Sequence, residues 1–137
     1  MKNNSILLLG STGTLGSNII KNNYFKNCLT PSSKELNLKN INTIFNFFKK
    51  NKIDTVIHCA AISSMLICEK NPVEAINTNI IGTQNLIEVI RNQKKKIKLI
   101  YISTDGVYPP NKGNNSEEDK LKPYNIYCFT KLCAENI

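Results

Sequence analysis

The segment Ile6-Leu7-Leu8-Leu9-Gly10-Ser11-Thr12-Gly13-Thr14-Leu15-Gly16 carries the strongest structural signal in this 137-residue chain. Its four leading apolar residues end at Gly10, and so short an apolar run predicts a buried strand of a parallel sheet. A helix is expected to follow from Leu15 to about Phe25. A glycine-rich turn between a strand and a helix can hold a pyrophosphate, because a helix N-terminus and its backbone N–H groups attract anions. The stretch therefore predicts a phosphate-binding turn near the start of the chain.

The rest of the chain continues the alternation of strand and helix. We expect a weak strand at 26–29, a helix capped by Asn40, a strand at 54–61, a helix from Asn71-Pro72 to about Asn92, a strand at 99–103, a polar loop at 106–123 and a last helix from about Asn125. This alternation predicts an α/β fold, a doubly wound parallel sheet with helices on both faces. Ligands of such sheets bind beyond the carboxyl ends of the strands. The residues expected at those ends, which should converge on one crevice, are Gly10–Gly16, Ala60-Ala61 and Ser103-Thr104.

Length and composition fit one globular domain of residues 1–137. Hydrophobic residues make up 41% of the chain, and the formal net charge of +8 comes almost wholly from lysine. The densest cluster, Lys94-Lys95-Lys96, lies between a helix and a strand and is interpreted as a solvated turn. Nucleic-acid binding would need a basic face with interleaved aromatic residues, so no nucleic-acid partner is expected. The apolar runs are too short for a membrane span or an export signal, so we expect no membrane partner and a cytoplasmic location.

Metal and disulfide chemistry are not expected. The five cysteines are odd in number and form no CxxC pair, which favours reduced thiols. The single histidine, His58, closes a strand-like run without a nearby ligand partner, whereas zinc sites need clustered ligands.

Tyr127 and Lys131 form a second chemical signal near the end of the sequence. Residues four apart lie on one face of a helix, so the phenol and the ammonium can share one site. An adjacent ammonium favours phenolate, and we expect it to lower the Tyr127 pKa toward neutral pH. Such a tyrosine can move a proton onto or off a sugar oxygen. Alone, the pair is also typical of a surface contact, but together with the glycine-rich turn it favours a nicotinamide enzyme.

Five blocks in one order carry a resemblance to the extended short-chain dehydrogenases/reductases, and it spans nearly all of the chain. The blocks are Gly10-Ser-Thr-Gly-Thr-Leu-Gly16, His58-Cys-Ala-Ala61, Asn79-Ile-Ile-Gly-Thr83, Ser103-Thr-Asp105 and Tyr127-Cys-Phe-Thr-Lys131. Within that family, residues 34–38, 102–105 and 127–135 are most similar to dTDP-4-dehydrorhamnose reductases. The resemblance implies a Rossmann-like fold and reduction of the 4-keto group of a nucleotide-linked deoxysugar, with NADP or NAD as cofactor.

The resemblance also implies roles for individual residues. Tyr127 would be the proton donor, Lys131 its electrostatic partner and a ligand of the nicotinamide ribose, and Thr104 a hydrogen-bond donor to the reacting oxygen. Asn79 would support the lysine through its side-chain amide. The implied cofactor-binding residues are Gly10, Thr12, Gly13, Thr14, Leu15, Gly16, Asn37, Leu38, Ala60, Ala61, Ile62, Tyr127 and Lys131.

Three positions depart from the family pattern. Gly106 stands where nucleotide-sugar 4,6-dehydratases carry a glutamate, which disfavours dehydration. Cys128 replaces the glycine that usually follows the tyrosine in the reductases, and Asn37 replaces a usual aspartate. Ser32, Ser33 and Lys34 could meet a 2′-phosphate, but a polar turn of this kind is common, so NADP and NAD both remain open.

The resemblance implies that the chain is truncated before the last strands of the family's sheet and before the C-terminal region that holds the nucleotide sugar. We therefore expect the 137 residues alone to bind cofactor poorly and to catalyse no reaction. The nucleotide-sugar partner would need that region, and a homo-oligomer is compatible with the sequence. Two alternatives stay open: an epimerase of the same superfamily, and a non-catalytic NADP-binding regulatory subunit.

Overall fold

A computed structural model of the chain describes residues 5–110 and 113–137. Its centre is a parallel sheet of four strands, which are β1 (Ile6–Leu9), β2 (Cys28–Leu29), β3 (Thr55–His58) and β4 (Lys98–Tyr101). The strand order is β2-β1-β3-β4, and the register pairs Leu9 with His58 and His58 with Tyr101. The carboxyl ends of three strands therefore lie side by side, as the alternating pattern predicted.

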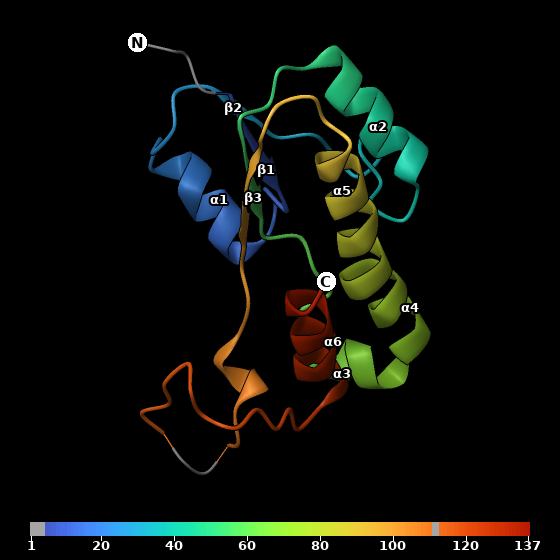
Figure 1. The fold of residues 1–137 in the computed structure, drawn as a ribbon. Coiled ribbons are helices and arrows are strands. Elements are labelled where there is room, and N and C mark those ends of the chain that lie inside the picture. The colour runs from blue at the N-terminus through green and yellow to red at the C-terminus, as the bar shows by residue number, and fades with distance from the viewer. Residues whose placement is uncertain (1–4, 111–112) are drawn as a thin grey trace.

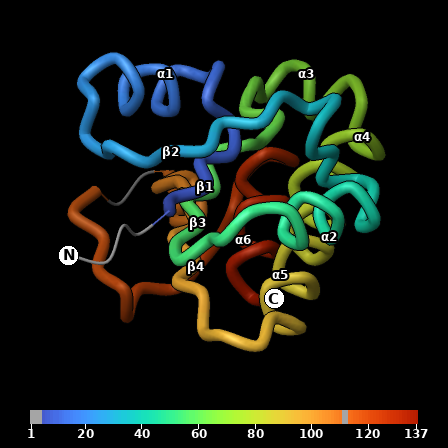
Figure 2. Tube along the Cα trace, turned by 90° about the horizontal axis from the view of Figure 1, so that it is seen from above, coloured from blue at the N-terminus to red at the C-terminus, as the bar shows by residue number. Residues whose placement is uncertain are grey.

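Helices cover both faces of the sheet. They are α1 (Thr14–Lys21), α2 (Ile41–Lys50), α3 (Met65–Lys70), α4 (Pro72–Ile76), the π-helical turn η1 (Asn77–Ile81), α5 (Gly82–Arg91), the 3₁₀ turn η2 (Asp105–Val107) and α6 (Ile126–Glu135). Figure 1 shows α1 on one side of the strands and α2 and α5 on the other. The view along the strands in Figure 2 shows the same two layers, with α6 on the α5 side. The predicted α/β Rossmann-like fold is confirmed.

The largest core lies between the sheet and the pair α2 and α5. Leu7 and Val56 from the strands meet Ile44 of α2 and Leu86 of α5, and all four side chains are fully buried. α2 begins where the sequence predicted, because the Asn40 side chain accepts a hydrogen bond from Asn42 N at 3.1 Å. Capping of this kind satisfies a backbone donor that the first helical turn leaves free.

Several expected boundaries are different in the structure. The strands expected at 26–29, 54–61 and 99–103 span Cys28–Leu29, Thr55–His58 and Lys98–Tyr101. The first helix ends at Lys21 rather than near Phe25, and Asn23 follows in a left-handed conformation (φ 51°) that closes the turn. The long helix expected at 71–92 is divided into α4, the π turn η1 and α5. The loop expected at 106–123 begins later, because Gly106 belongs to η2, which is capped by the Thr104 side chain.

α3 was not predicted. It begins at Ser64, whose side chain accepts a hydrogen bond from Ile67 N at 3.3 Å, a signal that was present in the sequence. Gly82 packs closely against the segment before α2, because a Cβ there would lie 3.0 Å from Leu38 Cβ.

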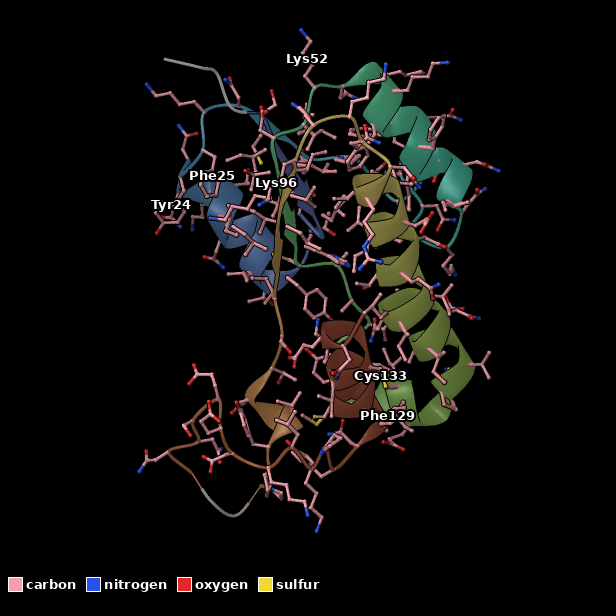
Figure 3. All side chains as sticks on the ribbon, in the orientation of Figure 1. Tyr24, Phe25, Lys52, Lys96, Phe129 and Cys133 are labelled. Carbon is pink, nitrogen blue, oxygen red and sulfur yellow. The ribbon has the colours of Figure 1, made fainter. Side chains whose placement is uncertain are left out.

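The lysine-rich turn lies at the opposite end of the sheet from the predicted crevice, since it precedes the first residue of β4. Figure 3 shows Lys52 and Lys96 toward one end of the molecule, and Phe129 and Cys133 of α6 toward the other. Lys95 forms an exposed salt bridge with Asp54 (Nζ to Oδ1 2.8 Å). The basic cluster is therefore separate from the candidate site.

Candidate functional site

The glycine turn packs directly against the end of β3. Gly10 has φ +81°, and a Cβ there would lie 2.6 Å from Ala60 N. Gly16 faces the turn from α1, and a Cβ on it would overlap the Gly10 carbonyl oxygen. Gly13 N donates a hydrogen bond to that oxygen at 3.1 Å and forms the N-cap of α1. Both Gly10 and Gly16 are required by close backbone approach, which leaves the N-terminus of α1 open to a ligand.

A cavity of about 470 Å³ opens over this turn, within the size range of small-molecule sites. Its walls come from the turn, from the segment after β2 and from the residues that follow β3. Eight predicted cofactor-binding residues line it, namely Gly10, Thr12, Gly13, Asn37, Leu38, Ala60, Ala61 and Ile62. The five that do not line it are Thr14, Leu15, Gly16, Tyr127 and Lys131.

Sequence reasoning missed part of the cavity wall. Thr78 reaches it from the π turn η1, and Lys39 reaches it from the turn before α2. Lys39 Nζ forms a salt bridge with Glu74 Oε1 of α4 at 2.6 Å, which ties that turn to the helix. No local signal marks either residue, because both arrive through tertiary packing. Cys59 could have been found, since it lies between His58 and Ala60 at the end of β3.

Lys131 is almost completely buried, with 3% of its surface exposed. Its Nζ lies 3.9 Å from the centre of the Tyr101 ring. Burial lowers the pKa of Lys131 to about 8, although Glu135 and Cys59 act in the opposite direction. In return, the Lys131 charge favours the Cys59 thiolate and opposes the rise that burial causes in that pKa. Cys59 lines the cavity and packs against Gly10. It therefore interacts with the charge of Lys131 and with the backbone of the glycine turn.

Tyr127 is half-buried on α6, and burial raises its pKa above the ordinary value. The thiols of Cys128 and Cys68 add to this rise. The expected lowering of the Tyr127 pKa by Lys131 is therefore wrong. The Tyr127 pKa is not lowered because the Lys131 ammonium lies on the ring of Tyr101. In this structure Tyr127 keeps its proton at neutral pH.

Asn79 joins three elements, but it does not bind the lysine through its amide as expected. Its Oδ1 accepts from Ile62 N at 2.8 Å, and its Nδ2 donates to Ile62 O at 3.1 Å and to Thr130 Oγ1 at 3.0 Å. Thr130 Oγ1 in turn donates to Tyr127 O at 2.7 Å. The π turn thus places a buried amide between the cavity wall and α6, and π turns of this kind are frequent at functional sites. Asn79 supports the residue next to Lys131.

His58 holds the ring of Tyr101 from the neighbouring strand. The two rings lie 5.5 Å apart in an edge-on arrangement. Thr83 Oγ1 donates to Asn79 O at 2.7 Å and lies 3.1 Å from His58 Nε2, so this nitrogen carries the proton and donates to Thr83. Burial and the charge of Lys131 lower the His58 pKa to about 3, which keeps the ring neutral.

Thr104 lies after β4 and is engaged locally. Its Oγ1 accepts from Gly106 N at 3.2 Å and donates to Asp105 Oδ1 at 3.3 Å. It lines a depression on the α6 side together with Tyr108 and Glu135, apart from the cavity over the glycine turn. The structure therefore places Lys131 on Tyr101 at the end of β4 and Thr104 in a separate hollow, and neither residue lines the cavity over the turn.

Gly106 and Cys128, two of the departures from the family pattern, touch each other. A Cβ on Gly106 would overlap the Cys128 sulfur, which is fully buried. The thiol therefore occupies the volume into which a side chain at position 106 would extend.

Across residues 5–110 and 113–137, no three His, Cys, Asp or Glu side chains gather in a group able to hold a metal ion. All five cysteines are free. No helix in this part of the chain is long and apolar enough to cross a membrane.

Comparison with known proteins places this geometry in context. A model of the family described as RmlD substrate binding domain matches residues 4–137. An uncharacterized membrane protein of Methanocaldococcus jannaschii is 31% identical over 156 residues, which cover 99% of this chain and 43% of that protein. The dTDP-D-glucose 4,6-dehydratase of Dictyostelium discoideum is 38% identical over 123 residues, which cover 76% of this chain and 28% of the enzyme.

Among solved structures, a dTDP-4-dehydrorhamnose reductase of Bacillus anthracis in complex with NADP superposes with a TM-score of 0.88 at 27% identity. The match covers 99% of this chain and 49% of the reductase. The chain thus spans less than half the length of each of these three proteins.

Proposed function

The chain belongs to the RmlD substrate binding domain family, within the NAD(P)-binding superfamily of nucleotide-sugar reductases, epimerases and dehydratases, and we propose that it forms the NAD(P)-binding portion of a 4-keto-deoxysugar reductase. One observation carries the proposal above all. The ammonium of Lys131 lies on the ring of Tyr101, Tyr101 pairs with His58, and Cys59, directly after His58, lines the cavity over the glycine turn. This arrangement supports a shared site for the two motifs that the sequence separates by more than a hundred residues.

The lining of the cavity supports binding of the pyrophosphate and adenosine part of a dinucleotide. Gly10 lacks the Cβ that would collide with Ala60, so the turn packs on the end of β3, and Gly10, Thr12 and Gly13 line the cavity where backbone N–H groups would bind a pyrophosphate. Asn37 and Leu38 would border the adenosine, and Ala60-Ala61 would pass beneath the cofactor. When bound, the nicotinamide would supply the hydride.

The protonation states of Tyr127 and Lys131 favour reduction of a carbonyl. Burial raises the Tyr127 pKa, so the phenol carries a proton that it can donate to an oxygen gaining negative charge. Lys131, with a pKa of about 8, is mostly charged at neutral pH and would stabilise that charge. Thr104 would contribute a hydroxyl donor once it exchanges its local bond for the substrate oxygen.

NADP is favoured over NAD by the wall of the cavity. None of the residues lining it, all within the described part of the chain, is acidic, whereas NAD sites use an acid to bind the ribose 2′-hydroxyl. Ser32 and Ser33 line the wall instead. The nearby Glu35 carboxylate accepts from Ser32 N at 2.9 Å and from Ser32 Oγ at 2.8 Å, which ties it into its own turn.

The contact between Gly106 and Cys128 supports a reductase rather than a dehydratase. A dehydratase needs a carboxyl group at position 106, and here the Cys128 sulfur fills the space beside the backbone. This observation favours reduction over water elimination, although one relative is named as a dehydratase.

The test uses protein purified from its native source, which is incubated with a dTDP-4-keto-6-deoxysugar and either NADPH or NADH. The proposal predicts net oxidation of NADPH, a lower rate with NADH, and a loss of about 10²–10⁴-fold in rate for Tyr127→Phe. Conversion of a sugar without net oxidation would show an epimerase instead. An unchanged biological role in the Tyr127→Phe variant would show a regulatory subunit.

A further inference from the structure

We propose that Tyr101 is a positioning residue for Lys131: the face of its ring holds the lysine ammonium in place and keeps it charged within the site. The inference rests on the proposed function, because it adds a residue to the same site. Tyr101 is the last residue of β4, and Lys131 lies in α6.

The ring of Tyr101 is in direct contact with the buried ammonium of Lys131. Lys131 Nζ lies 3.9 Å from the centre of the Tyr101 ring, well within the distance at which ammonium groups are attracted to aromatic faces. The salt bridges recorded for residues 5–110 and 113–137 join Lys39 with Glu74 and Lys95 with Asp54, so neither involves Lys131. A buried charge without a carboxylate at salt-bridge distance needs another source of stabilisation, and the ring is in position to provide it.

The ring is itself held in one orientation. His58 pairs with Tyr101 across β3 and β4 and contacts it edge-on. His58 is fixed by its hydrogen bond to Thr83, which is bonded to Asn79. A chain of buried groups thus leads from the π turn through the sheet to the ring beneath the lysine.

The ring rather than the hydroxyl carries the contact. The Tyr101 hydroxyl oxygen is buried and has no hydrogen-bond partner within the described residues. Burial also raises its pKa, so it stays neutral and adds no anionic charge near Lys131. Phenylalanine should therefore replace Tyr101 without loss, whereas a residue without an electron-rich face should not.

Other titratable groups face Lys131 from each packed element. Glu135 acts from α6, and Ser103 donates a hydrogen bond to its Oε1. Cys59 acts from the end of β3, beside the neutral His58. Glu135 and Cys59 favour the charged lysine, so their contribution has to be separated from that of the ring.

An NMR titration of the Lys131 side chain in the 137-residue chain, assigned with Lys131→Met, makes this separation. The compared proteins carry tyrosine, phenylalanine or pentafluorophenylalanine at position 101; the last has nearly the same shape but a reversed charge distribution on the ring. We expect the same Lys131 pKa with tyrosine and phenylalanine, and a pKa lower by about one unit with the fluorinated ring.

Equal Lys131 pKa values with phenylalanine and with the fluorinated ring would overturn the proposal. Tyr101→Leu should lower the pKa in the same direction, and if that variant does not fold, the two rings of equal shape still decide. Neither cofactor nor substrate enters the measurement. Failure of this inference is thus distinct from failure of the reductase proposal, which is read from NADPH oxidation.

Discussion

Gly106 and Cys128 are complementary: the buried thiol of α6 lies against the backbone of the 3₁₀ turn, where any side chain at position 106 would meet it. Both residues depart from the family pattern, and the missing side chain at position 106 leaves room for the Cys128 thiol. The turn and the helix that carry Thr104 and Tyr127 are joined through this contact.

Gly106→Ala should therefore destabilise the fold by about 1–3 kcal/mol, the usual cost of overpacking. In a Cys128→Ala background the sulfur is gone and the cost should largely disappear. Chemical denaturation of the four proteins in this double-mutant cycle measures the coupling. An equal cost of Gly106→Ala in both backgrounds would show that the two residues do not meet.

The glycines of the turn should differ sharply in their tolerance of alanine. Gly16→Ala places a methyl group against the Gly10 carbonyl, and we expect a loss of about 2 kcal/mol or more. Gly13→Ala is the matched control, because its Cβ would lie 3.4 Å from the same oxygen in ordinary contact. Thermal unfolding of both variants tests this, and similar losses would contradict the described packing.

His58 should make the fold sensitive to mild acid. Its pKa is about 3 in the folded chain against 6.5 when exposed, so the unfolded state binds the extra proton first. Stability is then complete above pH 6.5 and falls below it by about 1.4 kcal/mol per pH unit. The chain has one histidine, and the lowered carboxyl pKa values of Glu35 and Glu74 act below 4.5.

Equilibrium denaturation at pH 6.5 and 5.0 isolates this effect. The unmodified chain should lose about 2 kcal/mol between the two values, and His58→Gln should lose almost nothing. The same slope in both proteins would assign the acid sensitivity to other groups.

The sequence predicted the parts of the molecule that depend on local pattern. The apolar run before Gly10, the Asn40 cap and the Asn71-Pro72 helix start each act within a few residues, and the structure contains all three. Gly10 was predicted at the cofactor from the glycine-rich turn between a strand and a helix and from the family resemblance, and it lines the cavity.

What the sequence did not predict depends on directions set by packing. Residues four apart on α6 were expected to interact, but Lys131 extends onto the Tyr101 ring and leaves the Tyr127 pKa to burial. The partners of Asn79 depend on a π turn that no helical pattern reveals.

We propose that the cavity over the glycine turn holds the cofactor and that the bound nicotinamide reaches Lys131. The most direct test of this proposal is an NMR titration of the 137-residue chain with NADPH at millimolar concentration, where weak binding is still visible. We expect saturable changes in the chemical shifts of the backbone amides of Gly10, Gly13 and Ala60-Ala61 and of the Lys131 side chain. Absence of saturable shifts, or shifts confined to other faces of the molecule, would contradict it.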